Sequence, residues 1–156
     1  MTNTPASGPG VRYPPPLLFV LGIVAGWSLH RAFPLSLIGS AGGALVGWLL
    51  IALGTGLSLR AVATFRGART TIQPNRPAST LVTHGPFRLS RNPMYLGLSL
   101  VYLGVTLLMN SIWTLLFLPL VIAILHFTVI RKEERYLAAT FDIAYDEYRR
   151  RVRRWL

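Results

Sequence analysis

Four apolar runs, separated by polar segments, follow one another along this chain of 156 residues. The runs cover about residues 16–29, 35–59, 93–109 and 112–130. An α-helix of about 20 apolar residues crosses a hydrocarbon core about 30 Å thick. The first and third runs are somewhat short for this purpose, but all four are close to that length. The pattern predicts an all-α integral membrane protein with four transmembrane helices.

The polar segments suggest how the rest of the chain is organised. Residues 1–16 contain Pro and Gly but no basic start, so we expect a flexible N-terminal lead and no cleavable signal peptide. Residues 131–156 mix aromatic residues with arginines, which is typical of an amphipathic segment on a membrane surface. We therefore predict a single membrane domain over residues 17–156, with a loop at 60–92 and a cytoplasmic tail.

Basic residues gather on one side of the predicted spans. Six arginines lie between the second and third runs, and residues 131–156 hold eight of the sixteen Lys and Arg residues. The other two connections are nearly bare, with Arg31 in one of them. Because Lys and Arg near the ends of spans favour the cytoplasmic side, we expect the loop and both termini to face the cytoplasm.

The composition agrees with a membrane setting. Hydrophobic residues make up 52% of the chain, the mean hydropathy is +0.47, and 13% of residues are charged, against about 25% in soluble domains. The net charge of +11 lies beside spans and without a nucleic-acid recognition fold, which favours anionic headgroups over nucleic acid as partners. The absence of cysteine excludes disulfides and cysteine-ligated metals, and we expect no metal site.

Glycines recur every four residues in the first two runs, as Gly22 and Gly26 and as Gly39, Gly43 and Gly47. Small residues at this spacing let helix backbones approach closely in lipid. We interpret them as packing positions within one chain. A dimer interface is the alternative, and the oligomeric state stays open.

The third run has a well-marked start. Asn92 suits the cap position and Pro93 suits the first helical position, where its missing N–H costs nothing. Tyr95 and Gly97 then lie near unpaired N–H groups that carry partial positive charge, so this helix end could receive an anionic ligand group. The alternative is a capped helix with an interfacial tyrosine.

Ionisable residues follow the fourth run. His126, Glu133 and, less closely, Glu134 fall on one face of a helix, because seven residues make nearly two turns. Pro119 is expected to kink this helix, and a kink beside a polar face could open a cavity. Alternatively, His126 is a satisfied buried histidine, and the two glutamates pair with neighbouring basic residues.

The polar segments also carry an ordered series of motifs. The series is T-T-I-Q-P-N-R-P, L-V-T-H-G-P-F-R-x-x-R-N-P-M-Y-L-G, R-K-E-E-R-Y-L and F-D-x-A-Y-D-E-Y-R-R-R-V-R-R-W-L, over about residues 70–156. It resembles the isoprenylcysteine carboxyl methyltransferase and phospholipid methyltransferase superfamily. Two positions depart from the family pattern. Asn92 stands where many relatives have histidine, and Asp142 stands where the family often has glycine.

The resemblance implies an enzyme that binds S-adenosylmethionine in a cytoplasm-facing pocket. The expected cofactor-binding residues are His84, Gly85, Arg91, Pro93, Tyr95, Gly97, His126, Glu133 and Glu134. Arg91 and the helix-start N–H groups fit the cofactor's carboxylate. Glu133 or Glu134 fits its ammonium or ribose, and the ring of Tyr95 fits its sulfonium.

The acceptor is expected to be a lipidic or prenylated amphipathic molecule that enters from the bilayer. A carboxylate acceptor would need a cation, and an amine acceptor would need a base such as His126, Glu133 or Glu134. The motifs slightly favour the prenylcysteine-like carboxylate branch. The expected catalytic residues are Glu134, Arg149 and Arg153, and the expected substrate-binding residues are Tyr145, Tyr148 and Arg150.

Two other functions are alternatives. An NADPH-dependent membrane reductase of the sterol-reductase type has a similar C-terminal region, but such enzymes usually have many more spans. A non-enzymatic membrane scaffold would be expected to lose the motif residues, and this chain keeps Arg91, Tyr95 and both glutamates.

Overall fold

The computed structural model describes residues 8–11, 13–37, 42–68 and 78–156, and this part of the chain is helical, without a strand. The elements are α1 (Pro16–Ala32), α2 (Gly42–Gly67), the 3-10 turn η1 (Gly85–Arg88), α3 (Pro93–Met109), α4 (Ile112–Leu125), the π-helical turn η2 (His126–Ile130) and α5 (Arg131–Arg151). The all-α prediction is confirmed for these residues.

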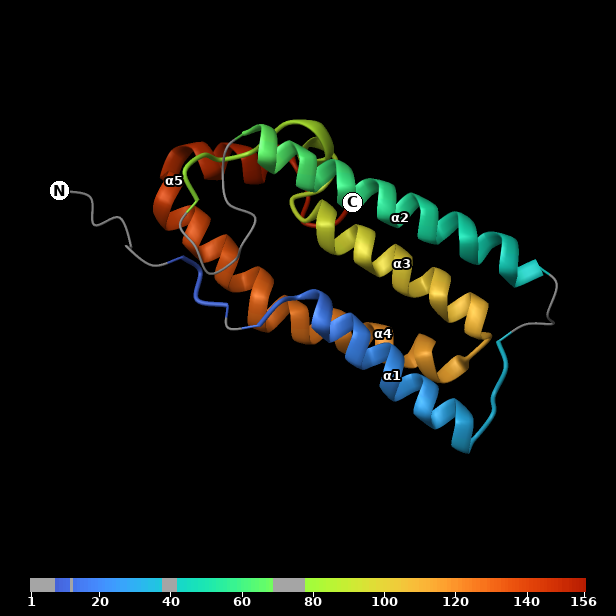
Figure 1. The fold of residues 1–156 in the computed structure, drawn as a ribbon. Helices are drawn as coiled ribbons and strands as arrows, with labels where there is room; N and C mark the ends of the chain where they lie inside the picture. The colour runs from blue at the N-terminus through green and yellow to red at the C-terminus, as the bar shows by residue number, and fades with distance from the viewer. Residues whose placement is uncertain (1–7, 12, 38–41, 69–77) are drawn as a thin grey trace.

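The helices form two pairs, with α2 along α3 and α1 along α4 (Figure 1). The pairs are joined through Tyr102 on α3, whose ring meets Phe19 of α1 edge to face. The Tyr102 hydroxyl also donates a hydrogen bond of 2.8 Å to the carbonyl of Thr114 on α4. The buried polar end of this tyrosine is thereby satisfied inside an apolar core.

Glycines allow the close approach within each pair. A Cβ on Gly26 would lie 2.6 Å from the Cα of Thr114, and a Cβ on Gly104 would lie 2.5 Å from the carbonyl oxygen of Gly47. The predicted role of these glycines in intramolecular packing is confirmed at Gly22, Gly26 and Gly47. Gly39 lies outside the described residues.

The third and fourth predicted spans match α3 and the combined α4 and η2, but the second was misplaced. Helix α2 begins at Gly42, not at 35, and continues to Gly67, past the predicted end at 59. Leu35 and Ser36 have no regular secondary structure, and Leu37 lies in a bend. They contact the α3–α4 turn, since Ile112 N–H donates to Leu35 O and Leu37 N–H donates to the side chain of Asn110. An apolar pattern in the sequence indicates which segment faces lipid, but it does not fix the residue at which a helix begins or ends.

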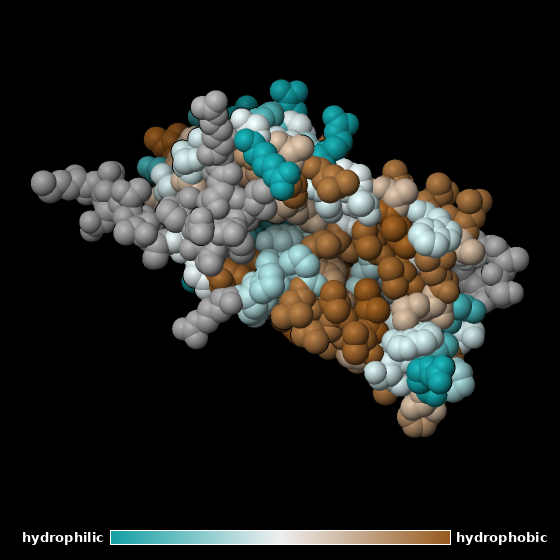
Figure 2. Space-filling model, in the orientation of Figure 1, coloured by the Kyte–Doolittle hydropathy of each residue, from teal (hydrophilic) through white to brown (hydrophobic). Residues whose placement is uncertain are grey.

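Two of the described helices are long and apolar enough to cross a membrane, namely α2 and the continuous helix that runs through α4, η2 and α5. Helices α1 and α3 are apolar and shorter, with 17 residues each. On the face drawn in Figure 2, hydrophobic side chains cover the middle of the bundle and hydrophilic ones lie towards its ends. Large apolar side chains such as Leu45, Leu53 and Leu116 are exposed, as expected of a surface in contact with lipid.

Within the predicted flexible lead at 1–16, the structure describes residues 8–11 and 13–16, and Val11 and Tyr13 among them pack against the bundle. Val11 is buried with Leu125 and Val129, and the Tyr13 hydroxyl is hydrogen-bonded to Thr128 Oγ1. Burial of an apolar residue and a satisfied hydroxyl hold this segment in place.

Helix α5 turns the chain back over the start of α3 (Figure 1). Its buried side chains include Tyr136, Tyr145 and Tyr148, and the Tyr148 hydroxyl donates a 2.7 Å hydrogen bond to Phe87 O. The predicted amphipathic tail is therefore a helix whose apolar face covers the loop before α3. Its first residue, Arg131, follows the fourth predicted span directly.

Asp142 interrupts the helical geometry of α5, with φ of 42° and ψ of −116°. A side chain at positive φ costs about 1–3 kcal/mol, and glycine avoids most of this cost. The conformation fits the glycine that the resemblance implies at this position.

Asp142→Gly should therefore stabilise the protein by about 1 kcal/mol and raise its melting temperature in detergent by roughly 2–4 °C. Ala144→Gly, at a nearby exposed helical position, is the matched control and should destabilise by about 1 kcal/mol. Equal losses from both substitutions would contradict this account of Asp142.

Candidate functional site

A cavity lies where the end of α2, the loop before α3, the first turn of α3 and helix α5 meet. It is open to the surface on one side and has a volume of about 120 Å³. Its polar lining consists of Thr80, Arg91, Asn92, Tyr95, Glu133, Glu134, Tyr136, Tyr145 and Tyr148. Its apolar lining consists of Pro9, Phe65, Ala78, Leu81, Val82, Phe87, Pro93, Met94 and Leu137. The cavity thus has a charged part beside an apolar one.

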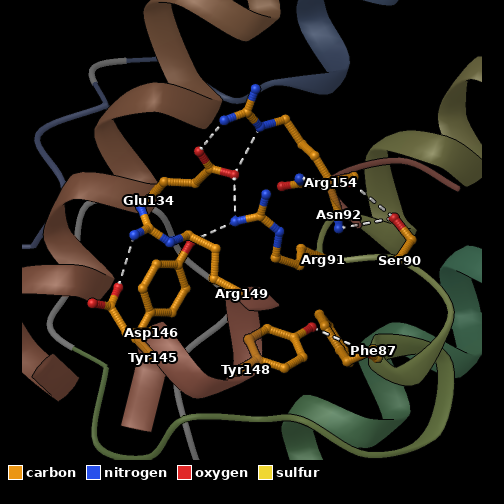
Figure 3. Close-up of polar contacts among 10 residues, drawn as sticks. All are labelled: Phe87, Ser90, Arg91, Asn92, Glu134, Tyr145, Asp146, Tyr148, Arg149 and Arg154. Atoms are coloured by element: carbon orange, nitrogen blue, oxygen red, sulfur yellow. Dashed lines mark hydrogen bonds and ion pairs between the residues drawn. The ribbon is translucent and has the colours of Figure 1, made fainter. Parts of the chain in front are cut away.

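Glu134 is the centre of an ionic cluster in this cavity (Figure 3). Arg154 binds it through two bonds, from Nε to Oε1 at 2.9 Å and from Nη2 to Oε2 at 2.7 Å. Arg91 Nη1 lies 3.2 Å from Oε1 and also donates to the Tyr145 hydroxyl at 3.3 Å. The side chains of Arg91 and Glu134 are only 10% and 17% exposed, so their attraction is less screened than at a surface. Glu134 thus pairs with Arg91 and Arg154, and not with the basic residues next to it in the sequence, which was the alternative prediction.

The C-terminal residues hold the loop that carries Arg91. The N–H of Arg91 donates to Arg153 O at 3.0 Å, and the hydroxyl of Ser90 donates to Arg154 O at 3.1 Å. Asn92 Nδ2 donates to the same Arg154 oxygen at 3.1 Å. Residues 90–92 are therefore fixed by the backbone of a segment more than sixty positions later.

These contacts correct the predicted role of Asn92. It occupies the cap position of α3, and Pro93 takes the first helical position as expected, but the Asn92 side chain makes no capping hydrogen bond. Its amide is used for the contact with Arg154 O instead. The Asn92 carbonyl accepts from the N–H of Leu96, which starts the helical ladder.

Glu133 faces a different partner from Glu134. The Tyr95 hydroxyl donates a 2.8 Å hydrogen bond to Glu133 Oε1. Burial raises the pKa of Glu133 to about 7; the Tyr95 hydrogen bond lowers the pKa, and the charge of Glu134 raises it further. A carboxyl group that changes protonation near neutral pH can accept a proton during a reaction.

Burial also raises the pKa of the cavity tyrosines Tyr145 and Tyr148, which keeps both phenols neutral. The hydrogen bond to Glu134 raises the pKa of Arg154, so this guanidinium stays charged. The cavity lining therefore offers the guanidinium of Arg91, neutral phenol hydroxyls and one carboxyl group whose pKa lies near 7.

Some residues expected at the site lie away from the cavity. His84 is exposed before η1, and Gly85 follows it with φ of 61°, which glycine adopts without strain. Gly97 is buried against α2, where a Cβ would lie 2.6 Å from Gly54 O. His126 is half-buried and meets Phe127 edge to face. Pro119 lies inside α4, and the change to π geometry comes later, at His126.

The expected arginines of the tail also point elsewhere. Arg149 pairs with Asp146 at 3.1 Å on the exposed side of α5, and the side chains of Arg150 and Arg153 are exposed. Arg154, which was not among the predicted site residues, binds Glu134 instead. The helix ends at Arg151 and Val152 is extended, with φ of −121° and ψ of 129°. The direction of the Arg154 side chain therefore cannot be predicted from helical periodicity. The run of arginines in the tail offers no other signal that distinguishes Arg154 from its neighbours.

Comparison with known proteins identifies the family of this chain. A family model described as phospholipid methyltransferase matches residues 43–143, which include α2, the loop, α3, α4 and most of α5. The chain is also 39% identical over 77 residues to the cobalt-zinc-cadmium resistance protein CzcN of Cupriavidus metallidurans. That alignment covers 49% of this chain and 35% of the relative, so about a third of the relative's length is matched. The family match spans well over half of the sequence, and the chain belongs to the phospholipid methyltransferase family, part of the isoprenylcysteine and phospholipid methyltransferase superfamily.

Proposed function

We propose that this protein is an S-adenosylmethionine-dependent membrane methyltransferase that acts on an amphipathic acceptor. Methyltransferases of its family use S-adenosylmethionine. The main observation behind this proposal concerns the guanidinium of Arg91 in the cavity lining. Its Nε is buried and has no hydrogen-bond partner in the part of the chain that the structure describes. An unpaired buried guanidinium N–H is costly, and a ligand carboxylate would satisfy it.

The other cavity residues fit the remaining groups of this cofactor. Glu134 can accept from its ammonium or ribose, and the neighbouring N–H groups at the start of α3 favour its carboxylate. The cofactor supplies an electrophilic methyl group on a sulfonium. The ring of Tyr95 can stabilise this positive charge. Arg91, Tyr95, Glu133 and Glu134 thus remain proposed cofactor residues, whereas His84, Gly85, Gly97 and His126 have other surroundings.

The apolar part of the cavity supports an acceptor with a hydrocarbon portion. Phe65, Leu81, Phe87, Met94 and Leu137 line this part, next to the charged cluster. An acceptor that places its hydrocarbon here would gain about 0.8 kcal/mol for each buried CH₂ group. Its polar head would lie near Tyr145 and Tyr148, as the sequence predicts.

The cavity favours an amine over a carboxylate as the acceptor head. A carboxylate needs a free cation, and the expected arginines of the tail, Arg149, Arg150 and Arg153, lie outside the cavity lining. An amine must lose a proton before it attacks, and the Glu133 carboxylate can take it. The bound cofactor would supply the methyl group to this nitrogen, with its neutral thioether as the leaving group. Phospholipid amine methylation is therefore our preferred reaction, and prenylcysteine carboxyl methylation is the second candidate.

The rate of amine methylation should rise with pH through about 7 and level off above it. Glu133 must be deprotonated to act as a base, and below its raised pKa of about 7 it is mostly protonated. Glu133→Gln should lower the rate by roughly 10²- to 10⁴-fold and remove this inflection. Glu147→Gln, at an exposed position of the same helix, is the control and should keep the wild-type profile. A wild-type rate that is flat between pH 6 and 8 would refute the role of Glu133.

For the membrane arrangement, we propose that α1, α2, α3 and the α4–η2 segment all cross the bilayer, with both termini in the cytoplasm. The 17 residues of α3 extend about 26 Å at 1.5 Å per residue, close to the thickness of the hydrocarbon core. A cysteine introduced at Thr2 should react with an impermeant reagent only from the cytoplasmic side, and one at Asn110 only from the opposite side. Reaction of both from the same side would exclude this topology.

Calorimetry on the detergent-purified protein tests the proposed function. S-adenosylmethionine should bind and NADPH should not, which separates a methyltransferase from a reductase and from a scaffold. Methyl transfer should then be compared across amine acceptors of increasing acyl or prenyl chain length. The rate should increase with chain length, and a rate independent of it would argue against an amphipathic acceptor.

A further inference from the structure

We propose that Arg154 neutralises Glu134 and so leaves the charge of Arg91 for the ligand, which makes the site select a ligand that bears a carboxylate. This inference rests on the proposed function. Arg154 is a positioning residue in this account, because it acts through Glu134 and Arg91. The geometry of the ionic cluster leads to this assignment.

The two arginines hold Glu134 unequally. Arg154 engages both carboxylate oxygens through its planar fork, at 2.9 and 2.7 Å. Arg91 meets only one of these oxygens, at 3.2 Å, and its Nε stays without a partner among the described residues. A bidentate pair is the stronger of the two interactions. The charge of Glu134 is thus neutralised mainly by Arg154, and the charge of Arg91 is left for a ligand.

The net charge of the cluster depends on Arg154. Two guanidinium groups and one carboxylate carry a net charge of +1, whereas Arg91 and Glu134 alone would carry none. The other nearby carboxyl group, Glu133, is turned towards Tyr95. The neighbouring arginines Arg149 and Arg151 pair with acidic residues of their own helix, Asp146 and Glu147, on the exposed side of α5.

Backbone contacts keep Arg154 in place for this role. Its carbonyl oxygen accepts from Ser90 Oγ and from Asn92 Nδ2, which flank Arg91 in sequence. The Arg154 side chain is 38% exposed and lies at the outer edge of the cluster, whereas Arg91 is 10% exposed. Arg154 can therefore neutralise Glu134 from outside while Arg91 remains available inside the cavity.

Two ligands that differ only in the carboxylate provide the test. Calorimetry on the full chain in detergent measures the affinity for S-adenosylmethionine and for its decarboxylated analogue, which keeps the ammonium. The wild type should prefer the first ligand. In Arg154→Gln this preference should fall about tenfold, because one positive charge is lost near the carboxylate. Arg154→Lys keeps the charge without the fork and should stay within about threefold of the wild-type preference.

Two further variants keep the test decisive even if one of the substituted proteins does not fold. Arg151→Gln removes one positive charge from the same tail at an exposed position and should leave the preference unchanged. Glu134→Gln raises the charge of the cluster to +2, and although both ligands lose a partner for their ammonium, the preference for the carboxylate should increase.

The outcomes separate this inference from the proposed function. If the wild type binds S-adenosylmethionine but Arg154→Gln keeps the full preference, or Arg154→Lys loses as much as Arg154→Gln, the charge-setting role is overturned. A decrease in the preference in Glu134→Gln would overturn it too. If the wild type does not bind S-adenosylmethionine, the proposed function fails, and this inference fails with it.

Discussion

Arg91→Ala should lower the affinity for S-adenosylmethionine by about ten- to a hundredfold, since one charge-assisted hydrogen bond contributes about 1.5–3 kcal/mol. The substitution removes the buried Nε that we assign to the ligand carboxylate, together with the contacts to Glu134 and Tyr145. The backbone N–H of residue 91 still donates to Arg153 O, so the loop before α3 should keep its position. The loss should appear as weaker binding in calorimetry, with a small change in melting temperature.

Arg88→Ala is the matched control for this experiment. Arg88 lies three residues earlier in the same loop, its side chain is exposed, and it does not line the cavity. Its replacement changes the net charge of the protein equally and should leave binding unaltered. If both variants lose affinity by the same factor, the effect is one of overall charge, and Arg91 has no specific role.

Gly97→Ala should destabilise the protein strongly. An added Cβ would lie 2.6 Å from Gly54 O and 3.2 Å from Ser58 N, both of which are backbone atoms of α2. Because backbone cannot move aside locally, α2 and α3 would have to separate along their contact. Overpacking of this kind costs about 1–3 kcal/mol, which corresponds to a decrease of roughly 2–12 °C in melting temperature.

Gly56→Ala provides the control on the other helix of this pair. Nothing lies within 4 Å of a Cβ at Gly56, which is exposed in the interior of α2. Alanine should be neutral there or stabilise by up to about 1 kcal/mol. The resemblance implied a cofactor-binding role for Gly97. If Gly97→Ala retained its melting temperature and lost only cofactor affinity, the packing role would be wrong and the cofactor role would stand.

Several features of this chain could be predicted from the amino-acid sequence because their causes are local. Asn92 and Pro93 begin α3, and Ser111, whose hydroxyl accepts from Thr114 N–H, begins α4. The apolar run that follows Ser111 ends at Arg131, where continued burial in lipid would become costly. The resemblance, and not a local pattern, placed Tyr95 and Glu133 at one site, where the two side chains are hydrogen-bonded.

Only the tertiary structure shows which of the many glycines and arginines of this chain line the cavity. Gly97 was expected at the cofactor, but its place on α3 faces Gly54 of α2, and a sequence pattern does not say which neighbour a helix face meets. The N-terminal lead gave a similar result, because burial of Val11 depends on side chains more than a hundred residues away.

The C-terminal arginines show most clearly which features depend on local sequence and which depend on tertiary contacts. The sequence by itself determined that a basic, aromatic segment follows the fourth apolar run, because composition and periodicity suffice to predict an amphipathic helix. Only the tertiary structure decided that Arg154, and not Arg149, Arg150 or Arg153, binds Glu134. The chain leaves helical geometry at Val152, and the backbone carbonyls of Arg153 and Arg154 are then held by hydrogen bonds from residues 90–92. Such long-range contacts have no counterpart in local residue spacing.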